Sequence, residues 1–113
     1  DQLLDGLTLA RLQRIFNQVM KRREDKIDPI RSSFGTIRRE PVSLEEKITG
    51  VLRYARERRR FSFFQLLDGQ RDKLEIVVTF LAVLEMMKSG QITIRQERLF
   101  DDIYIHMTDK END

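Results

Sequence analysis

The spacing of apolar residues changes at Gly90 from a helical period to a strand period, and this order of elements limits the possible folds most strongly. Upstream, three positions carry N-cap signatures for helices: Ser43, Ser62 and Asp72. Downstream, residues 91–95 and 103–106 alternate polar and apolar side chains, as the strands of a hairpin do. Three helices followed by a two-stranded hairpin predict a winged helix, a mainly α (α+β) fold.

The cap signatures also predict where each helix begins and ends. The expected helices are 43–58, a short 62–68 and 72–89. Gly69 is expected to end the short helix in the left-handed conformation that glycine adopts without strain. A small strand at 60–62 would complete the sheet of the wing.

A separate amphipathic helix is expected at residues 8–25, before the winged helix. Its apolar side chains fall on one arc at helical spacing: Leu9, Leu12, Ile15, Phe16, Val19 and Met20. Residues 28–42 contain Pro, Gly and Ser and predict a linker. The expected division is therefore 1–27 for the first helix, 28–42 for the linker, 43–106 for the winged helix and 107–113 for a tail. Whether the first helix packs on the winged helix stays open.

The third helix of the winged helix contains an unusually apolar stretch, residues 74–87. Fourteen residues are too few to span a membrane, which needs about 20, so we expect a core helix. The chain has no cysteine and no secretory leader, which favours the cytoplasm, and it begins as a fragment of a longer protein would. One arc of the helix is expected to be core: Ile76, Val77, Phe80, Leu81, Val83, Leu84 and Met87.

The opposite side of this helix offers carboxylates and apolar groups but no base. Its members are Leu74, Glu75, Val78, Thr79, Ala82, Glu85, Met86 and Ser89. A third helix that reads DNA needs Arg, Lys, Asn or Gln on its exposed side. We therefore expect this side to bind a protein. An alternative is that its apolar residues pack on another element of the same chain, such as the first helix.

Charge supplies a second hypothesis for function. The net charge is only +2, but the segments RYARERRR (53–60) and KRR (21–23) are basic runs that suit phosphates. Most such runs are solvated faces, so DNA binding through them is the alternative function. The sequence shows no phosphate loop, no metal-ligand spacing and no catalytic partner for the lone His106. We expect no enzyme, no cofactor, no metal and no small-molecule substrate.

Three segments resemble the C-terminal winged helix of the kleisins of the ScpA family, the bacterial segregation and condensation proteins A. They are PVSLEEKI, FSFFQLLDG and VVTFLAVLEMMKSGQITIRQERLFDDIYI, and the similarity covers about residues 41–105. Residues 3–25 are similar to the helix that ends the kleisin middle region. Where the family often has Gly after the wing Phe, this chain has Asp101.

The resemblance implies a non-enzymatic adaptor in the SMC–ScpA–ScpB complex, which acts in chromosome condensation and segregation. The winged helix would dock on the ATPase head of the SMC protein, the wider middle region would bind ScpB, and DNA would be held only indirectly by the complex, at the nucleoid. The residues expected to contact the SMC head are Leu74, Val78, Ala82, Glu85 and Met86 on the third helix, with Phe100 and Tyr104 on the wing. No membrane contact is expected.

Overall fold

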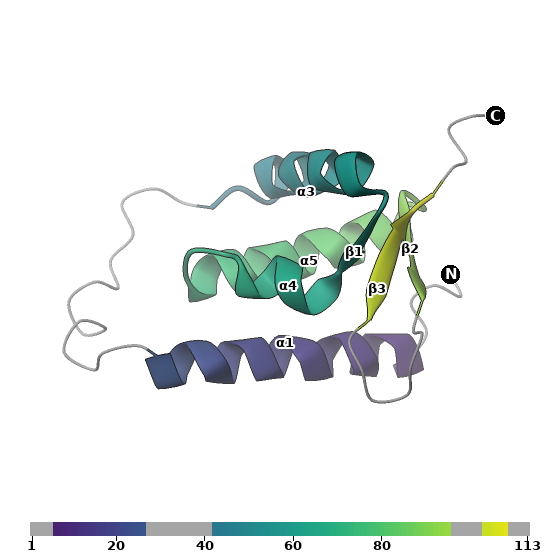
Figure 1. The fold of residues 1–113 in the computed structure, drawn as a ribbon. Coiled ribbons are helices and arrows are strands. Elements are labelled where there is room, and N and C mark those ends of the chain that lie inside the picture. Colours follow the sequence, from purple (N-terminus) through teal and green to yellow (C-terminus); the bar gives the residue numbers. More distant parts are fainter. Residues whose placement is uncertain (1–5, 27–41, 96–102, 109–113) are drawn as a thin grey trace.

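The computed structural model describes residues 6–26, 42–95 and 103–108, with side chains to residue 23 in the first helix. Its elements are α1 (Gly6–Lys26), α3 (Leu44–Arg58), β1 (Arg60–Ser62), α4 (Phe63–Asp68), α5 (Lys73–Lys88), β2 (Ile92–Arg95) and β3 (Tyr104–Met107). The mainly helical winged helix preceded by an amphipathic helix is confirmed (Figure 1). Within the described ranges, no helix is long and apolar enough to cross a membrane.

The helices of the winged helix begin where the sequence predicts, because each start is held by a side chain three residues away. The N-cap oxygens of Ser43, Ser62 and Asp72 accept hydrogen bonds from the backbone N–H groups of Glu46, Gln65 and Glu75, at 3.2, 3.0 and 2.9 Å. Such a bond satisfies a donor that the first turn of a helix would otherwise leave unpaired. Local chemistry alone therefore sets these boundaries.

The prediction for Gly69 is wrong. Its φ is −83°, in the right-handed region, and its N–H donates to the carbonyl of Gln65 as a further helical turn would. Positive φ angles occur instead at Gly90, with φ 81°, after α5, and at Arg59, with φ 65°, at the end of α3. The sharp reversal of the chain lies there, because α3 must turn directly into β1, whereas α4 leads into α5 through the residues 69–72.

The three strands form an antiparallel sheet in the order β1-β3-β2. Phe61 and Ile94 both lie opposite Ile105, so these side chains share the inner side of the sheet, which faces the core. The outer side carries the alternate residues: Arg60, Thr93, Arg95, Tyr104 and His106. The sheet closes the end of the molecule at which α3 ends, on the right in Figure 1.

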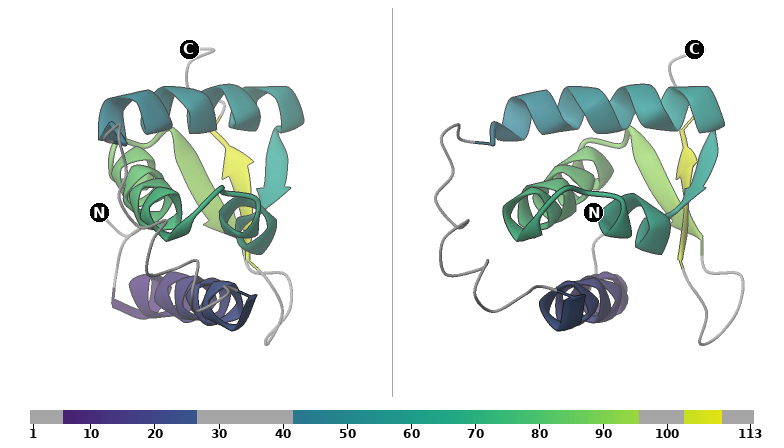
Figure 2. Two further views of the ribbon diagram at one scale, coloured as in Figure 1. Left: turned by 90° about the vertical axis from the view of Figure 1, so that its left-hand side faces the viewer. Right: turned by 60° about the vertical axis from the view of Figure 1, so that its left-hand side comes forward.

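The helix α5 lies at the centre, between α3 on one side and α1 on the other, with α4 beside it (Figures 1 and 2). Leu12 and Val19 of α1 are fully buried and belong to the same core cluster as Phe63, Ile76 and Ile105. The question that the sequence left open is thus answered: α1 is distinct along the chain but packs on the winged helix.

Two neighbouring arginines fasten α1 to α4. The guanidinium of Arg23 donates to the backbone carbonyls of Asp68 and Gln70, each at 2.9 Å. That of Arg22 lies 3.4 Å from the Asp68 carboxylate and over the ring of Phe64. Both arginines of the KRR run are therefore engaged within the fold.

Candidate protein-binding surface

The side of α5 that was expected to bind a partner is largely covered within this chain. Only 9% of Val78, none of Ala82 and 1% of Met86 is exposed. Lys47 of α3 lies 3.7 Å from the carboxylate of Glu75, which shares this side, and α3 makes the most extensive contacts with α5. The helix α3 therefore packs over Val78, Ala82 and Met86, and the expectation that they are exposed is wrong.

A different arc of α5 faces solvent. Leu74 and Leu81 are 43% and 45% exposed, Glu85 is exposed, and Val77 and Leu84 are half-buried. These five residues recur at three- and four-residue intervals, so they form one strip along the helix. We call them the outward strip of α5. Leu81 was expected to be core, and Val77 and Leu84 are less buried than predicted.

The helices α3, α1 and α4 contact other sides of α5, so the outward strip lies on the side that none of them covers. In the left view of Figure 2 this side is not covered by any of the described helices. Leu74 and Glu85 were among the predicted contact residues, so the sequence located two members of this strip. The sequence did not identify Leu81 as a member of the strip. Its spacing of seven residues from Leu74 shows that the two leucines share a side of the helix, but this spacing does not tell whether that side is exposed or buried.

The helix α1 borders the strip. The two helices run antiparallel (Figure 1), and the ring of Phe16 on α1 contacts that of Phe80 on α5. Leu9 precedes Phe16 by about two helical turns, so it lies on the same side of α1, and it is 38% exposed. Exposed leucines thus continue from α5 onto α1.

The remaining predicted contact residues do not join this strip. Tyr104 is half-buried on the outer side of the sheet, where the guanidinium of Arg60 lies 4.6 Å from the centre of its ring. Phe100 falls outside the described residues. The structure therefore brings together Leu74 and Glu85, buries Val78, Ala82 and Met86, and places Tyr104 on another face.

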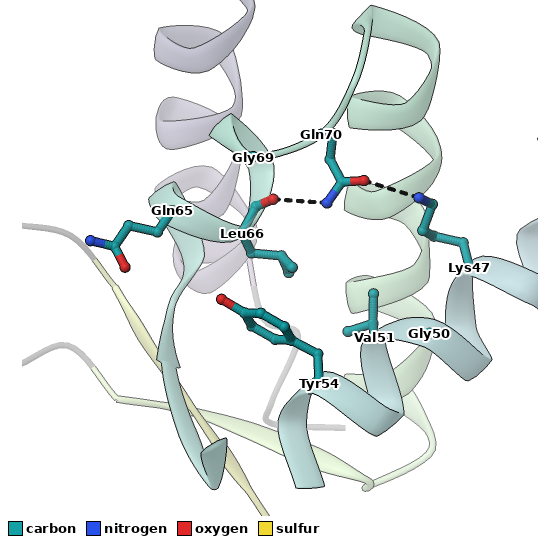
Figure 3. A pocket seen from close by; sticks show the side chains of 8 residues that line it. All are labelled: Lys47, Gly50, Val51, Tyr54, Gln65, Leu66, Gly69 and Gln70. Atoms are coloured by element: carbon teal, nitrogen blue, oxygen red, sulfur yellow. Dashed lines mark hydrogen bonds between the residues drawn. The ribbon is translucent and has the colours of Figure 1, made fainter. Parts of the chain in front are cut away.

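A cavity of about 330 Å³ lies between α3 and α4 (Figure 3). Of the described residues that line it, Lys47 alone is charged, and its ammonium donates to the side-chain oxygen of Gln70 at 2.9 Å. The amide nitrogen of Gln70 in turn donates to the carbonyl of Leu66 at 2.9 Å. These polar groups pair with one another across the seam between the helices, so the cavity lacks the converging charged groups of a typical ligand site.

The fold and this surface define a class: a winged-helix domain whose third helix presents an apolar rather than a basic side. The chain belongs to the family described as segregation and condensation protein ScpA, because the model of that family matches residues 7–108. The kleisin resemblance is thereby confirmed, and the match includes most of α1.

Relatives from Bacillus species are named segregation and condensation protein A. The Bacillus pumilus protein (strain SAFR-032) is 42% identical over 69 residues, 61% of this chain and 27% of the relative. The Bacillus cereus proteins of strains B4264 and AH187 are 36% and 37% identical over 106 and 101 residues, which are 92% and 88% of this chain and 40% and 38% of those relatives. The chain thus spans well under half the length of these relatives.

Proposed function

We propose that this chain is the part of a kleisin that docks on the ATPase head of an SMC protein in chromosome condensation and segregation. It acts as a non-enzymatic adaptor at the nucleoid, in the cytoplasm. The longer protein binds ScpB through its wider middle region. The observation that carries the proposal is the outward strip of α5, on a chain that belongs to the ScpA family.

The chemistry of the strip supports a protein partner. Leu74 and Leu81 lie on one side of a helix and are each close to half exposed, with Val77 half-buried between them and Glu85 at the rim. Contiguous apolar side chains with a polar border are typical of protein interfaces, where a few central apolar residues contribute most of the binding free energy. Burial of these leucines against a partner removes apolar surface from water.

The same strip argues against the DNA-reading use of a third helix. Glu85 repels phosphate, and the basic residues of α5, Lys73 and Lys88, lie at the two ends of the helix, so residues 74–87 between them include no basic side chain. A recognition helix places its hydrogen-bonding side chains along the surface that enters the groove. Leucines along the exposed side of α5 suit contact with a protein better than contact with DNA.

The test is binding of the purified chain to the ATPase head of its cognate SMC protein, by co-purification and calorimetry. Leu74→Arg and Leu81→Arg each place a desolvated charge in the interface, so we expect each to weaken binding at least a hundredfold. Leu44→Arg is the matched control, because Leu44 is a 39% exposed leucine on α3 and not on α5. It should bind as the wild type does.

Circular dichroism and thermal melting of all three variants separate loss of binding from loss of fold. Normal head binding by folded Leu74→Arg and Leu81→Arg would place the contact elsewhere. Loss of head binding in the Leu44→Arg variant alone would indicate that the contact lies on α3. Absence of head binding by the wild-type chain would contradict the proposal as a whole.

A further inference from the structure

We infer that the end of the molecule formed by the C-terminal turns of α3 and the outer side of the sheet binds the phosphate backbone of DNA directly and without sequence preference. We call this surface the basic end. It comprises Arg53, Arg56 and Arg58 on α3, Arg60 on β1, and Arg95 and Tyr104 on the wing strands. It is distinct from the outward strip of α5.

The first step is the density of charge. Residues 53–60 contain five arginines and one glutamate, and every arginine in this segment is exposed. Arg53 and Arg56 lie three residues apart, so they project from the same side of α3. Among the described residues neither makes an ion pair, a hydrogen bond or a ring contact, so both guanidinium groups are available to an anion.

The second step is the turn that joins the helix to the sheet. Arg59 has a positive φ, its N–H donates to the carbonyl of Ala55, and its own carbonyl accepts from the N–H of Met107 at 2.8 Å. These bonds tie the end of α3 to β3. They place Arg58 at the end of the helix next to Arg60 at the start of the sheet, so the basic residues of α3 and those of the sheet meet at this end of the molecule.

The third step is the outer side of the sheet, where basic and aromatic groups lie across the strands. Arg60 of β1 stacks on the ring of Tyr104 of β3, and Arg95 of β2 lies directly opposite Tyr104 on the other flank. Arg95 is exposed and has no ion pair with any residue that the structure describes. Arg58 stacks in the same way on Tyr54, with 4.4 Å from the guanidinium carbon to the ring centre.

Stacking explains why these guanidinium groups suit phosphate. A guanidinium over an aromatic ring uses its face for that contact, and its N–H groups match the oxygens of a phosphate. Ordering two such side chains in advance lowers the entropy lost on binding. We expect these arginines to contact the phosphate backbone of DNA and not the edges of its bases, so binding should show no sequence preference.

The partner is nucleic acid rather than an acidic protein because the basic end lacks apolar anchors. The large exposed apolar residues of the described part of the chain lie on α1, on α5 and at the start of α3: Leu7, Leu9, Leu44, Leu74 and Leu81. Protein interfaces rely on such anchors, whereas binding to a DNA backbone is driven by release of counterions from phosphates. The two basic runs also differ in their contacts, because Arg22 and Arg23 of the KRR run are engaged with α4.

The experiment is fluorescence anisotropy of the 113-residue chain with a labelled 30-base-pair duplex of arbitrary sequence, from 50 to 300 mM salt. The double variant Arg56→Gln/Arg95→Gln removes two phosphate contacts, so the slope of log K against log salt should become shallower by about 1.8. Affinity at 100 mM salt should fall at least tenfold. The matched control, Arg14→Gln/Lys21→Gln, removes the same charge from exposed positions of α1 and should change affinity less than twofold.

Three outcomes would overturn the inference. The wild-type chain could show no binding at 50 mM salt, or the two double variants could lose affinity equally, which would indicate net charge alone. Polyglutamate of matched length could bind more tightly than the duplex and with the same dependence on Arg56 and Arg95, which would indicate an acidic protein partner. Head binding by the Arg56→Gln/Arg95→Gln variant should be unchanged, so this test is independent of the proposed function.

Discussion

The ring of Phe16 on α1 lies 4.6 Å from the ring of Phe80 on α5, centre to centre, with the two planes tilted by 30°. Phe80 also lies 6.2 Å from Phe63 of α4, so it joins three helices. Through this contact α1 covers one side of α5 while α3 covers the other. The stretch 74–87 is apolar around most of its circumference because it is packed on several sides.

The pair of rings predicts a measurable coupling. Phe80→Ala should lower the free energy of unfolding by about 3–5 kcal/mol, and Phe16→Ala by less, because Phe16 is only half-buried. In a double-mutant cycle measured by urea denaturation, the two substitutions should couple by about 0.5–1.5 kcal/mol. Strict additivity would mean that α1 does not pack on α5 in solution. Leu84→Ala, at a half-buried position, should cost less than Phe80→Ala.

Arg22 and Arg23 are adjacent but should differ in their effect on stability. Arg23→Ala leaves two carbonyls of the α4–α5 turn without their charged donor, and we expect a loss of about 1.5–3 kcal/mol. The Arg22 side chain is 48% exposed and its contact to Asp68 is long, so Arg22→Ala should cost under about 1 kcal/mol. Thermal and urea unfolding of both variants check this order. Equal losses would show that the pairing with Asp68, and not the bonds to the carbonyls, holds α1 in place.

Replacement of Thr79 by valine should stabilise the protein. Its hydroxyl is fully buried and has no hydrogen-bond partner within the described structure, so Thr79→Val removes an unsatisfied polar group while the shape is kept. We expect a gain of about 1 kcal/mol in the free energy of unfolding. Thr49→Val is the control, since that hydroxyl is exposed and donates to the carbonyl of Glu45, and it should be close to neutral. A destabilising Thr79→Val would reveal a buried water bound to the hydroxyl.

Two substitutions on α5 distinguish the covered side from the outward strip. Met86→Arg places a charge beneath α3, at a position only 1% exposed, and should unfold the domain or lower its melting temperature by more than about 10 °C. Leu81→Arg, on the strip, should melt within about 3 °C of the wild type. Circular dichroism during heating measures both. A stable Met86→Arg variant would mean that α3 does not cover this side of α5, and the rotation of the helix would have to be revised.

The starts of α3, α4 and α5 were determined by sequence alone, because each depends on a hydrogen bond between a cap side chain and a backbone group three residues away. The strands were determined in the same local way, by alternation that puts Phe61, Ile94 and Ile105 on one side of the sheet. These signals span a few residues, so no distant part of the chain can alter them. They were sufficient for the fold class and for the kleisin resemblance.

Only the tertiary structure decided which side of α5 is free. A helix that is apolar on nearly every side has no preferred orientation in its own sequence, so Leu81 and Met86 are equally good candidates for the core. Their burial depends on where α3 and α1 pack, and that is set by contacts between residues far apart in the chain, such as Lys47 with Glu75 and Phe16 with Phe80. The basic runs differ for the same reason: α4 lies within reach of Arg22 and Arg23, whereas Arg53 and Arg56 project from a side of α3 that faces solvent.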